Sequence, residues 1–336
     1  MEYKMAIGIL IIIIIVAGAL IYTVTSPQKE SQETTEKYTI RTATLQGGIS
    51  TLDIIEQNNL LESTGYGLKV LRLQKTPDII AALANNETDL VVVPAEMAAK
   101  LIEQGGDYYI VAVDMLQNQA ILVVDNNITS PADLTGKLVG AVVASGTYKV
   151  FKAYMQTVYN LTVVESDQPQ PGVISVVNVP PGSIIDALLN KQVDAVVIWE
   201  PLVSIGVTKG AKILMSFSEL WHEAGLEGQP VMLVWLARGD FVENHPDALE
   251  AFLEARSQAA ETWINNMQET KQIIVSLYNL DDATFNTMYN RTVIVADKYL
   301  SDELIDSIRT EWWLAWKGGY LEQDPANIPD TVFYKG

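Results

Sequence analysis

The sequence contains no cysteine, which excludes disulfide bonds, thiolate metal ligands, cysteine nucleophiles and a lipid anchor on an N-terminal cysteine. It has only two histidines, and His222-Glu223 lacks the second histidine of a His-Glu-x-x-His zinc helix. No Gly-x-Ser-x-Gly elbow or Walker phosphate loop is present, and the acidic residues have no spacing typical of a glycosidase pair. The sequence therefore predicts a protein that is not an enzyme and that holds no metal or cofactor.

Basic residues are also scarce. The 22 Lys and Arg residues stand against 41 Asp and Glu residues, which gives a net charge of −19. Nucleic-acid binding is excluded because it needs clustered cations, and adhesion to anionic lipid is disfavoured for the same reason. With 336 residues, 49% of them hydrophobic, the chain is long enough for two domains with cores of their own.

One long apolar run lies at the N-terminus, where residues 5–24 follow Lys4 and match the length of a membrane-spanning helix. A cleavable signal peptide is the alternative, because Ala17-Gly18-Ala19 resembles a cleavage site. We therefore interpret residues 1–24 as a membrane anchor or signal peptide and favour the uncleaved anchor. Residues 25–37 are polar and are interpreted as a flexible linker. Lys4 would stay inside, so the folded part is expected outside the cytoplasm at the cell membrane.

An internal sequence repeat is the strongest indication of the fold. Residues 80–94 and 185–201 repeat one pattern at an offset of 105 residues: an apolar helix stripe, a polar turn with an Asp, then an aliphatic run. A strand-like segment precedes each copy, at residues 68–73 and 173–177. Strand, helix and buried strand make a βαβ unit whose parallel strands end at one edge of a sheet. Two such units predict two α/β lobes with a ligand-binding cleft between them.

The strands between the repeats predict how the chain is divided. A strand near residues 117–124 is expected to cross between lobes, and a strong strand at 230–237 would return the chain. The first lobe is thus expected from residues 38–117 and 217–336, and the second from 118–216.

Short polar or glycine-containing loops follow several strands and are candidates for ligand contact. Gln46-Gly47-Gly48 follows a strand at 38–44, and its backbone N–H groups could approach a ligand or simply form a tight turn. Ser145-Gly146-Thr147 lies between a strand at 138–143 and a helix expected at 148–159. These residues are either ligand contacts or an ordinary N-cap.

The second repeat ends in Trp199-Glu200, where the first ends in Pro94-Ala95. Trp199 either stacks on a ligand or closes the core. Glu200 is expected to be exposed at the mouth of the cleft, where it would bind a ligand amine or act as a solvated hinge residue. An acid there would repel an anion, whereas free backbone amides would suit an oxyanion. The charge of the ligand therefore stays open.

The chain resembles the nitrate/sulfonate/taurine-type substrate-binding proteins of ABC importers. Four motifs, which occur in the order typical of that family, carry the resemblance: Ala82-Leu83 through Asp89-Leu90-Val91-Val92-Val93-Pro94, Asp133-Leu134-Thr135-Gly136-Lys137-Leu138-Val139-Gly140, Asp186-Ala187-Leu188 through Asp194-Ala195-Val196-Val197-Ile198-Trp199-Glu200-Pro201, and Phe241 through Pro246. Pyrimidine-synthesising enzymes of the same superfamily carry a cysteine-bearing signature, which this chain cannot have.

This resemblance implies an α/β, two-lobed type II periplasmic-binding-protein (Venus-flytrap) fold. It also implies a monomer that binds a small solute and delivers it to an ABC permease and its ATPase. By position, the ligand-binding residues would be Gln46, Gly47, Gly48, Pro94, Ala95, Gln119, Ser145, Gly146, Thr147, Trp199 and Glu200. An N-terminal transmembrane helix would replace the family's cleaved signal or lipidated cysteine. A sensory ectodomain with a signalling partner is the alternative function, and a biosynthetic enzyme on the same fold is the third.

Overall fold

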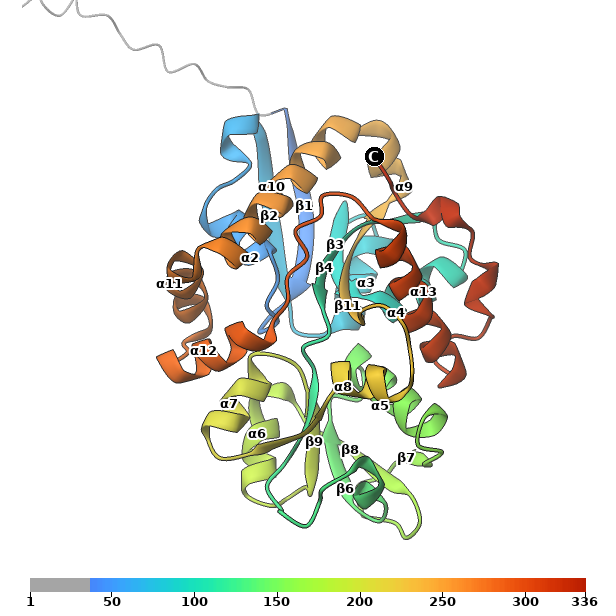
Figure 1. Ribbon diagram of the computed structural model, residues 1–336. Coiled ribbons are helices and arrows are strands. Elements are labelled where there is room, and N and C mark those ends of the chain that lie inside the picture. The colour runs from blue at the N-terminus through green and yellow to red at the C-terminus, as the bar shows by residue number, and fades with distance from the viewer. Residues whose placement is uncertain (1–36) are drawn as a thin grey trace, which may run out of the picture. The chain divides into compact units, whose positions relative to one another are not determined.

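Residues 37–336 are described by the computed structural model, and their strands form two sheets (Figure 1). The first sheet has the order β2 (Tyr66–Leu73), β1 (Tyr38–Leu45), β3 (Leu90–Pro94), β11 (Val231–Arg238), β4 (Tyr108–Leu116). The second has the order β10 (Lys212–Ser216), β5 (Ala120–Val123), β9 (Ala195–Ile198), β6 (Leu138–Ala141), β8 (Ile174–Asn178), β7 (Val163–Glu165). We call each sheet with the helices on it the first and the second lobe.

Helices cover both sheets. The helices between strands of the first lobe are α2 (Leu52–Gln57), α3 (Thr76–Ala84) and α4 (Ala95–Glu103). Those that follow strands of the second sheet are α5 (Gly146–Thr157), α6 (Pro181–Leu189), α7 (Leu202–Thr208) and α8 (Phe217–Glu223). After β11 come α9 (Gly239–Asn244), α10 (Pro246–Asn265), α11 (Met267–Tyr278), α12 (Asp282–Arg291) and α13 (Asp302–Lys317). Short 3-10 turns lie at Glu62–Thr64, Pro131–Leu134, Pro325–Asn327 and Asp330–Val332.

The internal repeat in the sequence corresponds to a repeated strand order in the two sheets. In the first sheet, β1 lies between β2 and β3 and is parallel to both. In the second sheet, β6 lies between β8 and β9 in the same way. An antiparallel strand then follows on the β3 or β9 side, β11 in one sheet and β5 in the other. The predicted pair of βαβ units is confirmed, with one strand inserted inside each unit.

The repeated aspartates hold equivalent positions. Asp89 accepts a hydrogen bond from the backbone N–H of Arg41 at 2.8 Å, and its own N–H donates to the carbonyl of Arg41 at 2.8 Å. Asp194 makes the same pair of bonds with Leu138, both at 2.8 Å. Each aspartate therefore fastens the turn after its helix to the strand in the middle of the βαβ unit. This explains why an Asp precedes both aliphatic runs.

Helix α13 contacts both lobes. Trp312 donates its indole N–H to the carbonyl of Ala95 at 2.9 Å and packs in the core of the first lobe. Leu314 belongs to the core of the second lobe. Near the end of the helix, a Cβ on Gly318 would overlap Ala153 of α5. Trp313 of the same helix is 41% exposed and belongs to neither core.

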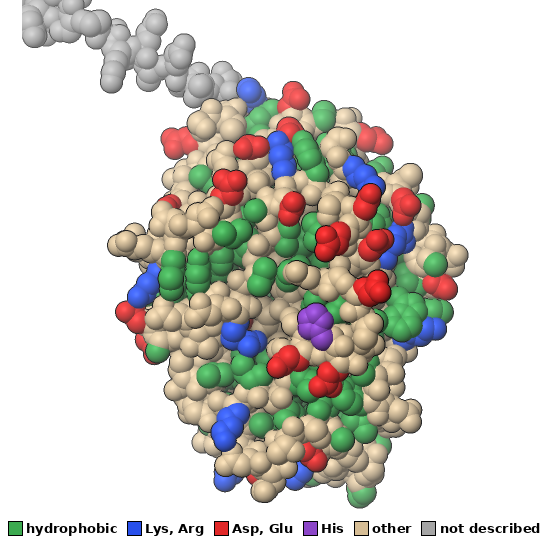
Figure 2. Space-filling view, in the orientation of Figure 1, with side chains coloured by type: hydrophobic (Ala, Val, Ile, Leu, Met, Phe, Trp, Pro, Cys, Tyr) green, Lys and Arg blue, Asp and Glu red, His purple; other side chains and the backbone are tan. Residues whose placement is uncertain are grey.

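The expected lobe boundaries stay a prediction, since helices after residue 217 contact both lobes. The expected N-terminal membrane helix and linker lie outside the described residues, apart from residue 37. Within residues 37–336, none of the helices is both long and apolar enough to cross a bilayer. On the face shown in Figure 2, Lys and Arg side chains lie apart from one another, without a basic patch.

Candidate functional site

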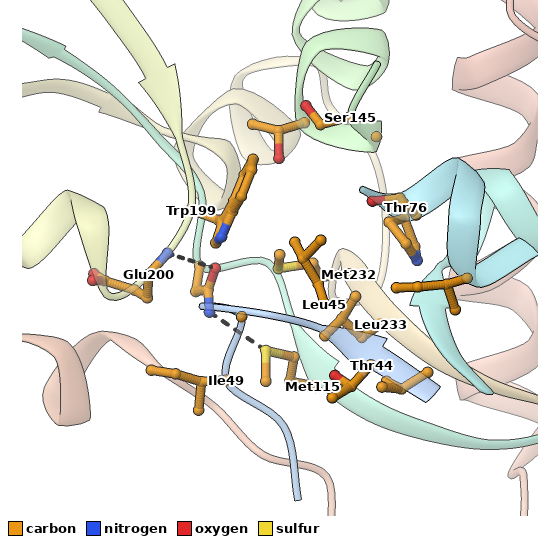
Figure 3. A pocket seen from close by; sticks show the side chains of 17 residues that line it. Thr44, Leu45, Ile49, Thr76, Met115, Ser145, Trp199, Glu200, Met232 and Leu233 are labelled. Carbon is orange, nitrogen blue, oxygen red and sulfur yellow. Dashed lines mark hydrogen bonds between the residues drawn. The ribbon is translucent and has the colours of Figure 1, made fainter. Parts of the chain in front are cut away.

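A pocket with about 50 Å³ of space open to water-sized molecules lies where strand ends of both sheets meet (Figure 3). In Figure 3, Trp199 and Ser145 of the second lobe face Thr76, Leu45 and Met232 of the first lobe across the pocket. The pocket therefore lies at the cleft that the paired repeats predict.

Seven of the eleven residues expected at the ligand line this pocket: Gly48, Pro94, Ser145, Gly146, Thr147, Trp199 and Glu200. The other four, Gln46, Gly47, Ala95 and Gln119, are not among its lining residues. The lining shows which residues the fold brings together; ligand contact itself stays a prediction.

The four residues outside the lining have structural positions of their own. Gln46 and Gly47 form a tight turn in which the N–H of Gly48 donates to the carbonyl of Leu45 at 3.1 Å, and Gly47 has the positive φ of 84° that favours glycine. Ala95 is fully buried and accepts the bond from Trp312. Gln119 lies behind the pocket and donates its side-chain N–H to the hydroxyl of Thr147 at 3.0 Å.

The sequence analysis missed the pocket's apolar lining and two of its hydroxyls, those of Thr44 and Thr76. Met232 and Leu233 come from β11, which is antiparallel to β3, so its first residues lie at the edge where β1 and β3 end. The sequence analysis took its candidates from the residues that follow strands, so it could not identify two residues at the start of a strand. The complete set of missed lining residues is Thr44, Leu45, Ile49, Thr76, Ile79, Val92, Met115, Asn118, Met232 and Leu233.

The N-terminus of α5 opens onto the pocket. The helix begins at Gly146, two residues before the expected start, so Gly146 and Thr147 occupy its first positions. N–H groups there have no carbonyl partner within the helix and favour negative or electron-rich groups. Ser145 is the N-cap, because its hydroxyl accepts the N–H of Tyr148 at 3.3 Å and donates to the carbonyl of Val142 at 2.6 Å. Its hydroxyl is thus engaged locally.

Trp199 both packs in the core and lines the pocket. It is 6% exposed, and its buried indole N–H has no hydrogen-bond partner among residues 37–336. A buried donor without an acceptor costs free energy, so a polar ligand atom in the pocket would relieve that cost.

The expectation of an exposed Glu200 is wrong. Glu200 is 1% exposed, and its carboxylate accepts hydrogen bonds from Arg291 at 2.6 Å and from the N–H of Ser204 at 3.0 Å. Burial raises the pKa of Glu200, and the guanidinium of Arg291 opposes that shift. Arg291 ends α12, more than ninety residues later in the chain, so no local pattern could reveal this ion pair.

Residues 49–279 match the NMT1-like family. The chain belongs to this family. The NMT1-like chain is 25% identical to the taurine-binding periplasmic protein of Escherichia coli over 210 residues, which are 62% of this chain and 61% of the relative. It is 22% identical to a putative binding protein of Brucella abortus over 279 residues, 82% of this chain and 81% of the relative. The first match thus spans about three fifths of the taurine-binding protein.

Solved structures share the fold of this NMT1-like protein. The periplasmic aliphatic sulphonate binding protein of Escherichia coli superposes with a TM-score of 0.69 at 17% identity, over 87% of this chain and 97% of the other. The periplasmic nitrate-binding protein of Synechocystis gives 0.63 at 16% identity, over 86% and 84%. The resemblance seen in the sequence and the two-lobed periplasmic-binding-protein fold are both confirmed.

Proposed function

We propose that this NMT1-like protein binds a small solute in the pocket between its lobes and delivers it to the permease and ATPase of an ABC importer. The observation that carries the proposal is the pocket at the meeting of two repeated βαβ units, in a chain whose relatives are named as binding proteins. A binding protein rather than an enzyme fits this pocket, because its lining has no acid–base pair and its one carboxylate, Glu200, is paired with Arg291.

The lining favours a solute with an apolar body and one electron-rich end. Ile49, Met115 and Met232 offer apolar surface. The start of α5 and the indole N–H of Trp199 offer neutral donors, which suit an oxyanion such as a sulfonate. No Lys or Arg is among the lining residues of this pocket in the described part of the chain.

The Glu200–Arg291 pair determines how the pocket acts on a charged solute. Because Arg291 compensates Glu200, that carboxylate neither repels an anion strongly nor stays free to bind an amine. We therefore propose a sulfonate or similar oxyanion with an apolar tail in preference to an amino-sulfonate such as taurine.

The sequence also bears on where the protein is located in the cell. The apolar run at residues 5–24 supports an anchor in the cell membrane with the two lobes outside the cytoplasm. We propose that the protein works as a monomer attached to the membrane in this way.

Thermal unfolding of the full chain in detergent tests the function. Pentane-1-sulfonate at 100 times its Kd should stabilise the protein by about 2.7 kcal/mol, and taurine at the same concentration should do so less. The variant Trp199→Ala should lose most of the shift. Taurine and nitrate are tested in the same way, as is any copurified solute that mass spectrometry identifies. If the melting temperature stays unchanged with all of these and with pentane-1-sulfonate, the transport function is refuted.

A further inference from the structure

Two helix N-termini from different lobes touch at Glu96 and Gly146. Glu96 lies in the first turn of α4, and Gly146 is the first residue of α5. A Cβ on Gly146 would overlap Oε1 of Glu96 and lie 2.8 Å from Cβ of Pro94. Any side chain at position 146 would therefore push α5 away from α4. The glycine is required here for space, because its φ is not positive.

Glu96 is buried in this contact without a counter-charge. Its side chain is 2% exposed, and Oε1 has no hydrogen-bond partner among the described residues. Glu96 is not itself in the pocket lining, whereas its contacts Pro94 and Gly146 are. It thus lies immediately behind the pocket wall, where the two lobes meet.

The titratable groups nearest to Glu96 in the described part of the chain include no counter-charge that pairs with it. Glu311 of α13 is 1% exposed; its Oε1 accepts the side-chain N–H of Gln117 at 3.0 Å, and its Oε2 has no partner in residues 37–336. Tyr320 after α13 and Tyr154 of α5 are the other titratable neighbours of this acid pair. Lys149 of α5 lies 6.0 Å from the Tyr320 ring.

The positively charged side chains near Glu96 and Glu311 are paired with other acids or form no ion pair with these two. Lys100 of α4 is paired with Glu103 and Glu322. No ion pair within residues 37–336 reaches Glu96 or Glu311. Burial therefore raises the pKa of Glu96 to about 7 and also raises the pKa of Glu311.

We propose that Glu96 is a positioning residue whose protonation favours the closure of α5 against α4, so that closure of the cleft takes up a proton below neutral pH. The proposal rests on the proposed function, because it describes how the same site closes over its solute. Opening would admit water to the carboxyl group, which could then ionise at its ordinary pKa. Glu96 itself contacts no solute.

The direction of the pH effect follows from these two states. The closed form holds the proton up to a pKa of about 7, and the open form releases it near the ordinary value of 4.5. Between these values the closed form binds more protons, so closure weakens as pH rises and levels off above about pH 7. Solute affinity at pH 5 should exceed affinity at pH 8 by about tenfold or more.

The distance between the lobes provides a test that needs no solute. Because the chain has no cysteine, Gln74→Cys and Ser183→Cys place one spin label on an exposed residue of each lobe. In the full chain without ligand, the distance measured by pulsed electron resonance should be longer at pH 8 than at pH 5. Glu96→Gln should keep the short distance at both pH values, whereas Gly146→Ala should keep the long one.

Glu303→Gln, at an exposed carboxyl group on α13, is the matched control and should behave like the parent. A distance in the parent that does not change with pH, or a Glu96→Gln variant that still responds to pH, overturns the proposal. Binding of pentane-1-sulfonate, measured by calorimetry on the same samples, separates the two ideas. If the distance shifts with pH but no probe binds, only the proposed function fails. If a probe binds with the same affinity at both pH values, closure is not linked to protonation.

Discussion

Arg291 donates its Nε–H to Oε1 of Glu200 at 2.6 Å and joins the end of α12 to the end of β9. The same guanidinium donates to the carbonyl of Asn118 at 3.2 Å, in the segment that crosses between the sheets. One arginine thus holds together two parts of the pocket wall, since both Glu200 and Asn118 line the pocket.

Removing that arginine should destabilise the protein strongly. Arg291→Ala leaves a buried carboxylate without its partner, which should lower the free energy of unfolding by about 3–5 kcal/mol. Urea denaturation measures the change. Lys209→Ala, which breaks an exposed 3.7 Å pair with Asp186, is the matched control and should cost less than about 1 kcal/mol. A loss equal to that of the control would show that the buried pair is not needed.

Trp199 should report solute binding through its indole N–H. Trp199→Phe keeps an aromatic ring but removes the unpartnered donor, so affinity for pentane-1-sulfonate should fall about fivefold to tenfold. Tryptophan fluorescence should change on binding in the parent and hardly at all in the variant. Unchanged affinity in Trp199→Phe would mean that the indole N–H does not meet the solute.

Gln119 should affect affinity although it lies outside the pocket lining. Its bond to the Thr147 hydroxyl fixes a residue in the first turn of α5, and Gln119→Leu should therefore weaken solute binding severalfold, by about 1 kcal/mol. Thr147→Val should have a similar effect. Calorimetry on the double variant should show less than the sum of the two losses; full additivity would contradict the coupling.

Stability should fall as pH rises toward neutrality. The pKa of Asp53 is raised to about 6 and that of Glu96 to about 7, and burial raises that of Glu311 as well. The folded protein therefore holds more protons than the unfolded chain between the ordinary values and these raised ones. We expect the melting temperature to be higher at pH 5 than at pH 8.

Glu311→Gln tests one part of this pH dependence. The amide keeps an oxygen to accept the bond from Gln117 and removes the buried charge, so it should raise the free energy of unfolding at pH 8 by about 1–3 kcal/mol. At pH 4 the parent and the variant should unfold alike. A variant that is less stable at pH 8 would show that the ionised carboxylate is favourable in the fold.

Local sequence patterns predicted the strands, the helices and the two-lobed fold, but not the contacts that the side chains make. The repeat at Asp89 and Asp194 predicted both βαβ units, because the hydrophobic periodicity of a helix or a strand can be recognised within a short stretch of consecutive residues. Pro94, Gly146 and Trp199 could be placed at the pocket for the same reason: each lies at or shortly after the end of a strand. The helix that the sequence predicts at 148–159 begins two residues later than α5 does, because a glycine between a strand and a helix is typical of a loop.

Contacts between distant segments account for what was missed. Glu200 could not be identified as buried, because the arginine that neutralises it lies on a helix with no motif of its own. Met232 was missed because its place depends on β11 running antiparallel beside β3. Glu96 gave no signal in the sequence, as its burial depends on the packing of α5 and α13 against α4.

The position of β11 also constrains the order in which the chain acquires its structure. Residues 231–238 lie between β3 and β4, which are both made well over a hundred residues earlier. Until β11 is synthesised, β3 and β4 have open edges toward each other. The strands of the second sheet, in contrast, all lie within residues 120–216. During translation the lobe encoded in the middle of the gene should therefore fold first, and the lobe that begins the folded region should be completed afterwards.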